Sequence, residues 1–127
     1  MSKHETINYL EFPSRNLSAS KGFFSAVFGW TFPNYGSDYG PEYTAFSDAG
    51  VDGGFYAADQ ASSTANGSVL VVFYSDNLES TQGNVEAAGG LIVKPIFSFP
   101  GGRRCQFTEP GGNEFAVWTD CAPSVSL

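Results

Sequence analysis

The stretch INYLEFPSRNLSASKGFFSAVFG (Ile7–Gly29) occurs a second time, in altered form, as SVLVVFYSDNLESTQGNVEAAGG (Ser68–Gly90). A shift of the chain against itself by about 61 residues aligns the two copies. The identical pairs are Phe12/Phe73, Ser14/Ser75, Asn16/Asn77, Leu17/Leu78, Gly22/Gly83, Ala26/Ala87 and Gly29/Gly90. An internal repeat of this length predicts a chain built from two similar structural modules.

Each copy follows the same local pattern, beginning with an extended apolar run. The predicted first strands are Ile7–Phe12 and Val69–Tyr74. An asparagine, Asn16 or Asn77, comes next, and its side-chain oxygen can cap the first turn of a helix. Apolar residues at helical spacing predict helices over about Leu17–Phe28 and Leu78–Ala88, and glycines follow both.

Shorter extended runs separated by Gly-rich turns predict three more strands after each helix. They are Trp30–Asn34, Tyr43–Asp48 and Gly53–Ala57 in the first copy, and Leu91–Pro95, Arg103–Thr108 and Asn113–Thr119 in the second. The chain is therefore predicted to be one α+β domain over residues 1–127. It comprises a βαβββ module at about 6–57, a small polar linker at 58–67, a second module at about 68–119 and a short C-terminal tail. One module is too small to bury a core alone, so the two are expected to pair.

The composition excludes several classes of protein. The chain is 42% hydrophobic and 16% aromatic, which is enough to form a core, and its net charge of −7 disfavours nucleic acid as a partner. No apolar run approaches the roughly 20 residues that span a bilayer, and no signal peptide is recognisable. Two cysteines do not make a disulfide framework. We expect a reduced, cytoplasmic protein that binds neither nucleic acid nor a membrane.

Three stretches carry a resemblance to a known family. INYLEFPSRNLSASKGFFSAVFGW, EAAGGLIVKPIF and FTEPGGNEFAVW together resemble the vicinal oxygen chelate superfamily, which contains glyoxalase I, extradiol dioxygenases, fosfomycin-resistance enzymes and bleomycin-resistance proteins. The resemblance covers about Ile7 to Thr119. It implies two βαβββ modules that pair into curved mixed sheets around a cavity. It does not imply one reaction, because a fold hosts many.

The resemblance also says where a metal would be held. In metal-dependent members, the ligands come from the first and last strands of the modules. The matching positions are Tyr9, Leu70, Ala116, and Gly54 or Phe55. Divalent ions in such sites prefer imidazole and carboxylate ligands, which these positions lack. Glu11 and Glu114 without histidine also make a poor site, so we predict no metal and no other cofactor.

Strand alternation selects candidate ligand-binding residues. It places Tyr9 with Glu11, Arg104 with Gln106, and Glu114 with Ala116 and Trp118. The residues predicted to face the cavity and bind a ligand are Tyr9, Glu11, Phe55, Leu70, Arg104, Gln106, Glu114, Ala116 and Trp118. Arg104 either binds an anion in the cavity or forms a cross-strand ion pair with a glutamate.

Other chemically notable residues have plainer interpretations. His4 is the only histidine and precedes the first strand, so it is expected at the surface. Without a second histidine, a Ser–His or Cys–His catalytic pair is hard to build. Cys105 should be a small buried hydrophobe. The Gly/Tyr-rich stretch Pro33–Tyr43 either covers the mouth of the cavity or is an ordinary surface loop.

Three functions remain open at this point. The first is metal-free binding of a small aromatic or cationic organic molecule in an aromatic-lined cavity, by a homodimer. The second is an enzyme of the same superfamily, with an atypical metal site or acid–base chemistry by Tyr9 and Glu11. The third is a structural or regulatory domain whose dimer surface is its function. No residue is assigned a catalytic role by the sequence, and pairing of the modules within one chain or across a dimer stays open.

Overall fold

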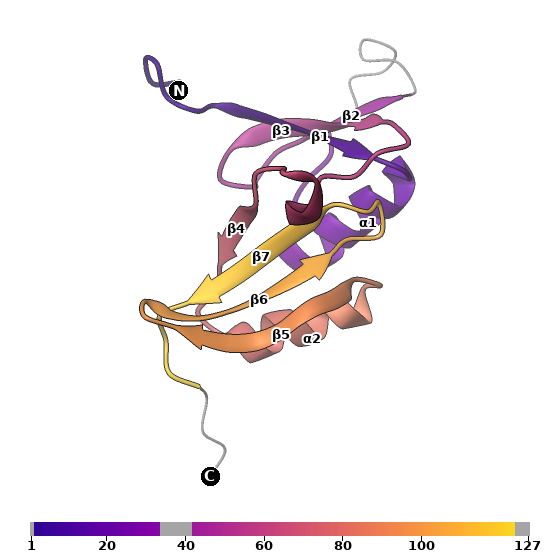
Figure 1. Ribbon diagram of the computed structural model, residues 1–127. Helices are drawn as coiled ribbons and strands as arrows, with labels where there is room; N and C mark the ends of the chain where they lie inside the picture. Colours follow the sequence, from indigo (N-terminus) through magenta and orange to yellow (C-terminus); the bar gives the residue numbers. More distant parts are fainter. Residues whose placement is uncertain (1, 34–41, 124–127) are drawn as a thin grey trace.

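The computed structural model of the chain describes residues 2–33 and 42–123 (Figure 1). The elements of the first module are β1 (Tyr9–Ser14), α1 (Leu17–Phe28), β2 (Tyr43–Phe46) and β3 (Asp52–Ala57). A short 3-10 helix, η1 (Thr64–Asn66), follows. The elements of the second module are β4 (Val71–Tyr74), α2 (Leu78–Ala87), β5 (Leu91–Phe99), β6 (Gly102–Thr108) and β7 (Glu114–Thr119).

The strands form two mixed sheets. Within the described residues, one sheet has the order β1-β3-β2 and the other has the order β4-β7-β6-β5. In both, the first strand of the module runs parallel to the last, and the remaining pairs are antiparallel. The predicted α+β fold of two similar modules is confirmed, since each sheet follows the same order of pairing.

The helix predictions hold because their signals are local. Helix α1 has the predicted bounds: the Asn16 side chain accepts a hydrogen bond from the Ala19 N–H at 3.0 Å, and Gly29 ends the helix at φ 70°. Asn77 caps α2 in the same way, through the Ser80 N–H at 3.2 Å. The described helices contain no segment long and apolar enough to cross a membrane.

Two strand predictions are wrong. In place of a strand from Trp30, Thr31 forms only an isolated bridge to Ser47. The Trp30 ring is 6% exposed and stacks between Phe24 and Phe46, with centroid distances of 4.3 Å to each. Burial of this ring, rather than strand pairing, decides the path of the chain. Strand β5 continues past Pro95, because the ladder shifts register between Lys94 and Phe97, the interval that contains this proline, after a first shift between Ile92 and Lys94.

An aromatic core joins the two modules. Phe24 of α1 is fully buried and contacts Phe55 of the first sheet, with ring centroids 5.5 Å apart. It also contacts Phe73 and Phe115 of the second sheet, at 6.4 and 5.2 Å. The prediction that Phe55 faces a cavity is wrong. The pairing of β1 with β3 aligns Phe55 with Phe12 and turns both rings into the core, 5.6 Å apart.

A buried polar cluster at the EPGGN turn also joins the modules. We call Ser14, Ser20, Glu109, Gly111 and Asn113 the hairpin latch. Glu109 accepts hydrogen bonds from the Ser20 hydroxyl at 2.8 Å, the Gly111 N–H at 2.5 Å and the Asn113 amide at 2.7 Å. The same Asn113 amide donates to the Pro13 carbonyl at 2.6 Å. The latch therefore ties the last hairpin of the second module to β1 and α1.

Candidate functional site

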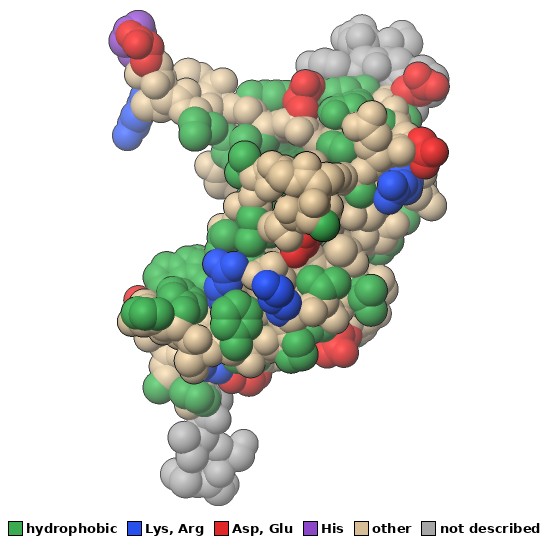
Figure 2. Space-filling model, viewed as in Figure 1, with side chains coloured by type: hydrophobic (Ala, Val, Ile, Leu, Met, Phe, Trp, Pro, Cys, Tyr) green, Lys and Arg blue, Asp and Glu red, His purple; other side chains and the backbone are tan. Residues whose placement is uncertain are grey.

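Each sheet has two faces, and we call the one away from the helices its outer face. On the second sheet, cross-strand pairing arranges the outer side chains in rows. The middle row is Lys94, Gln106, Ala116 and Val72, and the next row is Phe97, Arg104, Trp118 and Tyr74. We call the latter the aromatic–arginine row. In Figure 2, Lys or Arg side chains stand among hydrophobic ones over this sheet.

The aromatic–arginine row is accessible to solvent. Tyr74 is 53% exposed and Phe97 is 37% exposed, whereas Trp118 between them is half-buried. The Trp118 ring meets Tyr74 edge-on, with centroids 5.2 Å apart, and the Arg104 guanidinium lies over the Phe97 ring at 5.6 Å. The row therefore offers ring faces and edges together with a cation.

A chain of hydrogen bonds crosses this face. The Arg104 guanidinium donates to the Gln106 side-chain oxygen at 2.6 Å, and the Gln106 amide donates to Glu114 at 2.9 Å. The other Glu114 oxygen accepts from the Thr64 N–H at 2.8 Å and its hydroxyl at 2.9 Å. Burial acts to raise the pKa of Glu114. The hydrogen bonds from Thr64 and Gln106, together with the charge of Lys94, outweigh burial, so the pKa lies below its usual value. Glu114 is thus already occupied in anchoring η1.

The outer face of the first sheet carries a different cluster. The Tyr43 hydroxyl donates to Glu11 at 2.8 Å and contacts the Tyr9 hydroxyl at 2.5 Å. Tyr43 lies on β2 and Glu11 on β1, and β3 lies between these strands. The Tyr43 ring must therefore cross β3, which it does at Gly54. A Cβ at Gly54 would lie 2.2 Å from the Tyr43 oxygen, so only glycine leaves this path open. Burial, aided by the bonds to Tyr9 and Glu11, raises the pKa of Tyr43 and keeps it protonated.

An apolar pocket lies where the two modules meet, with a volume of about 370 Å³. Leu10, Phe12, Trp30 and Phe46 contribute to one side, and all four residues of β4, Val71–Tyr74, contribute to the other. An aromatic-lined cavity was expected, but this one contains none of the nine residues predicted to bind a ligand. Tyr74 belongs both to its lining and to the aromatic–arginine row.

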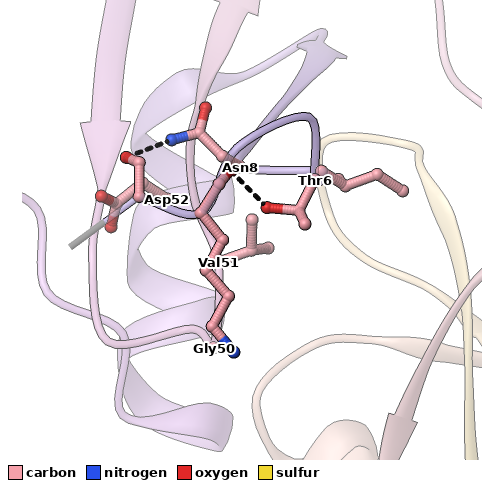
Figure 3. A pocket seen from close by; sticks show the side chains of 8 residues that line it. Thr6, Asn8, Gly50, Val51 and Asp52 are labelled. Atoms are coloured by element: carbon pink, nitrogen blue, oxygen red, sulfur yellow. Dashed lines mark hydrogen bonds between the residues drawn. The ribbon is translucent and has the colours of Figure 1, made fainter.

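A second recess, of about 390 Å³, is polar and lies against the N-terminal segment. Figure 3 shows Thr6 and Asn8 beside Gly50, Val51 and Asp52 at the turn into β3. The Asn8 amide donates to the Ser2 hydroxyl at 2.9 Å. This recess is formed by an exposed segment, which also carries the exposed His4, and the predicted ligand residues lie elsewhere.

Comparison with known proteins agrees with the paired modules. The model of the Glyoxalase/Bleomycin resistance protein/Dioxygenase superfamily matches residues 6–117. The chain belongs to this superfamily. A glyoxalase/bleomycin resistance protein/dioxygenase family enzyme from Burkholderia phytofirmans PsJN has a similar fold, with a TM-score of 0.72 at 17% identity over 88% of this chain and 96% of that one. Lactoylglutathione lyase from Agrobacterium tumefaciens gives a TM-score of 0.64 at 17% identity, over 93% and 96% of the two chains.

A relative of higher sequence identity is the anthracycline biosynthesis protein DnrV of Streptomyces peucetius. It is 27% identical over 87% of this chain. The chain spans 45% of the length of that relative. The similarity therefore concerns one part of DnrV, not the whole protein.

The superfamily's metal positions do not fit a divalent ion in this chain. Tyr9 is bonded to Tyr43, Leu70 immediately precedes β4, and Ala116 is fully buried between Val72 and Gln106. None of these side chains offers the imidazole or carboxylate that such an ion prefers. Over residues 2–33 and 42–123, no three His, Cys, Asp or Glu side chains are grouped to hold one.

The structure divides the predicted ligand residues between two sheets. Tyr9 and Glu11 lie together on the first outer face, as predicted. Arg104, Gln106, Glu114, Ala116 and Trp118 share the second outer face. Arg104 is bonded to Gln106, so the direct ion pair with a glutamate is not observed. Sequence reasoning gave no site role to Tyr43, Lys94, Phe97 or Tyr74, whose places depend on pairing between strands.

The remaining predictions concern cysteine and the stretch after Pro33. Cys105 is fully buried, and burial raises the pKa of its thiol to about 11, which makes it an unreactive core residue. The stretch Pro33–Tyr43, which the sequence left open as a cavity cover or an ordinary surface loop, lies mostly outside the described residues.

Proposed function

We propose that this chain binds a small aromatic organic molecule, without a metal ion, on the outer face of its second sheet. The aromatic–arginine row carries the proposal, because Phe97 on β5 and Trp118 on β7 present partly exposed rings on either side of Arg104 on β6. Protein sites for such ligands combine apolar and aromatic walls with a few polar groups. Similarity to an anthracycline biosynthesis protein supports this ligand class, since anthracyclines are planar fused-ring molecules.

The proposal includes a homodimer. Ile7 and Val69 are each 83% exposed, and Leu91 at the edge strand β5 is 65% exposed. A second copy that covered these apolar side chains would remove their surface from water, which favours association. The same partner could wall the outer face of the second sheet, where the ligand would bind.

The binding proposal predicts that an aromatic ligand changes the fluorescence of Trp118 when it binds. Titration with 2-naphthylmethanol, a neutral probe, should quench Trp118 fluorescence, and Phe97→Ala should weaken binding about tenfold through lost ring contact. Tyr56→Ala removes a comparably exposed ring from the first sheet and should leave affinity unchanged. Chelator treatment should have no effect. Loss of binding on chelation, or equal effects of the two substitutions, would contradict the binding proposal. Sedimentation of the same samples tests whether the protein is a dimer.

A second candidate function rests on the Tyr9–Tyr43–Glu11 cluster. A carboxylate bonded to a protonated phenol can take a proton from a substrate, and Tyr9 and Tyr43 could then stabilise the developing oxyanion. This function predicts catalysed deuterium uptake next to the carbonyl of a probe such as phenylacetone in D2O, followed by NMR. Glu11→Gln should lower that rate by about 10²-fold or more, whereas Glu42→Gln, an exposed acid just before β2, should not. Exchange at the uncatalysed rate with the unmodified protein would exclude this candidate.

A further inference from the structure

We propose that the aromatic ligand is an anion, held by Arg104 through a carboxylate or a similar oxyanion attached to its ring. This inference rests on the proposed function and specifies the charge of its ligand. It starts from the contrast between the neighbouring residues Arg103 and Arg104 on β6, whose side chains lie on opposite faces of the sheet.

Arg103 has a carboxylate partner, and Arg104 does not. On the helix side, Arg103 forms an ion pair with Glu79 of α2. On the outer face, within the described residues, the Arg104 guanidinium donates a single hydrogen bond, to the side-chain oxygen of the neutral Gln106. Among the ion pairs of the described residues Arg104 has none. The Nε atoms of both arginines are buried without a hydrogen-bond partner, so the contrast lies in the carboxylate. A guanidinium has five N–H donors, so Arg104 retains capacity for a bidentate acceptor.

Cations and carboxylates both lie near Arg104. Lys94 lies on the same outer face, opposite Gln106. The acid nearest along the hydrogen-bond chain is Glu114, and both of its oxygens are taken by Thr64 and Gln106. The Tyr74 hydroxyl, at the other end of the row, donates to a second carboxylate, Asp120, at 2.7 Å. Two cations and two carboxylates therefore lie on or beside this face, and the preference for an anion rests on the Arg104 guanidinium, which has no ion-pair partner among the described residues.

The geometry joins the charge to the rings. Arg104 stands between Phe97 and Trp118 in the cross-strand row, and its guanidinium lies over the Phe97 ring. A planar ligand stacked on this row would bring a substituent on its ring edge within reach of the guanidinium. A carboxylate at that place would form charge-assisted hydrogen bonds, which are about twice as strong as neutral ones.

Three naphthalene probes of similar size test the inference: 2-naphthoate, 2-naphthylmethanol and 2-naphthylmethylammonium. We expect calorimetry to show 2-naphthoate binding about tenfold more tightly than the alcohol, with the ammonium weakest. Arg104→Gln should abolish the preference for naphthoate, because it weakens naphthoate binding more than alcohol binding. Arg103→Gln is the matched control on the opposite face and should keep the preference.

The outcomes separate the two proposals. If the alcohol or the ammonium binds at least as tightly as naphthoate, the ligand's charge is wrongly assigned and aromatic binding stands. If Arg103→Gln removes the preference as fully as Arg104→Gln, general electrostatics rather than Arg104 selects the ligand, and the inference fails. If none of the probes binds, both the inference and the proposed function are overturned.

Discussion

Replacing Phe24 with alanine is expected to lower the free energy of unfolding by about 4 kcal/mol, because it empties the centre of the aromatic core. Phe24 is fully buried in α1, and its ring lies within 6.4 Å of rings from both sheets. Smaller side chains in such a position lose both the transfer free energy and the packing around the resulting cavity.

Urea denaturation followed by circular dichroism measures this effect, and Phe97→Ala is the control. Phe97 has the same chemistry but is 37% exposed, so its replacement should cost less than about 1 kcal/mol. Because Phe24 contacts both modules, the unmodified chain should unfold in one transition. A Phe24→Ala variant no less stable than Phe97→Ala would show that the core does not depend on this ring.

The helices and the order of the modules could be predicted because their signals are local or repeated. Asn16 and Asn77 occupy matching places in the two copies, and each caps the helix that follows. The identity of Ser14 and Ser75 in the repeat has a structural cause as well. Each hydroxyl bonds a hydroxyl six residues later, at 2.8 Å in both modules. A repeated serine where the first strand ends thus marked a contact with the following helix, buried in the first module and part-buried in the second.

Which face of a strand is buried could not be predicted with the same success. Gly54 and Phe55 are adjacent on β3, and alternation alone allows either to face the core. Pairing with Phe12 turns Phe55 inward and leaves Gly54 outward, beneath the Tyr43 ring. The contact between Tyr43 of β2 and Glu11 of β1 crosses the strand between them, β3, so it depends on a register that no local pattern encodes.

The acids of the closing hairpin show the same limit. The sequence drew attention to Glu114, which starts β7, but its carboxylate anchors η1 across the segment predicted as a linker. The buried acid is Glu109, which is 2% exposed. A glutamate before Pro-Gly-Gly does not by itself signal burial. Of the partners that make burial tolerable, Asn113 lies in the same turn, but Ser20 lies on α1, far away in the sequence.

Replacing Glu109 with alanine is expected to cost about 3 kcal/mol of unfolding free energy, because the hairpin latch loses its central acceptor. The Ser20 hydroxyl and the Asn113 amide keep other partners, Ser14 and Pro13, but the Gly111 N–H loses the side chain it bonds. Urea denaturation at neutral pH measures the change. Glu86→Ala, an exposed acid of α2, should change stability by less than about 0.5 kcal/mol.

The pH dependence of the latch has a definite sign. Burial raises the pKa of Glu109 above 4.5, although hydrogen bonds from Gly111, Ser20 and Asn113 oppose the shift. As the pH rises, Glu109 therefore loses its proton at a lower pH in the unfolded chain than in the folded chain. This contribution to stability is fully present below about pH 4.5 and is lost as the pH passes the raised value. The unfolding free energy of the unmodified chain minus that of Glu109→Gln should therefore be larger at pH 4.5 than at pH 7.5. A difference that stays constant or grows with pH would mean that the latch holds Glu109 ionised throughout, with its hydrogen bonds outweighing burial.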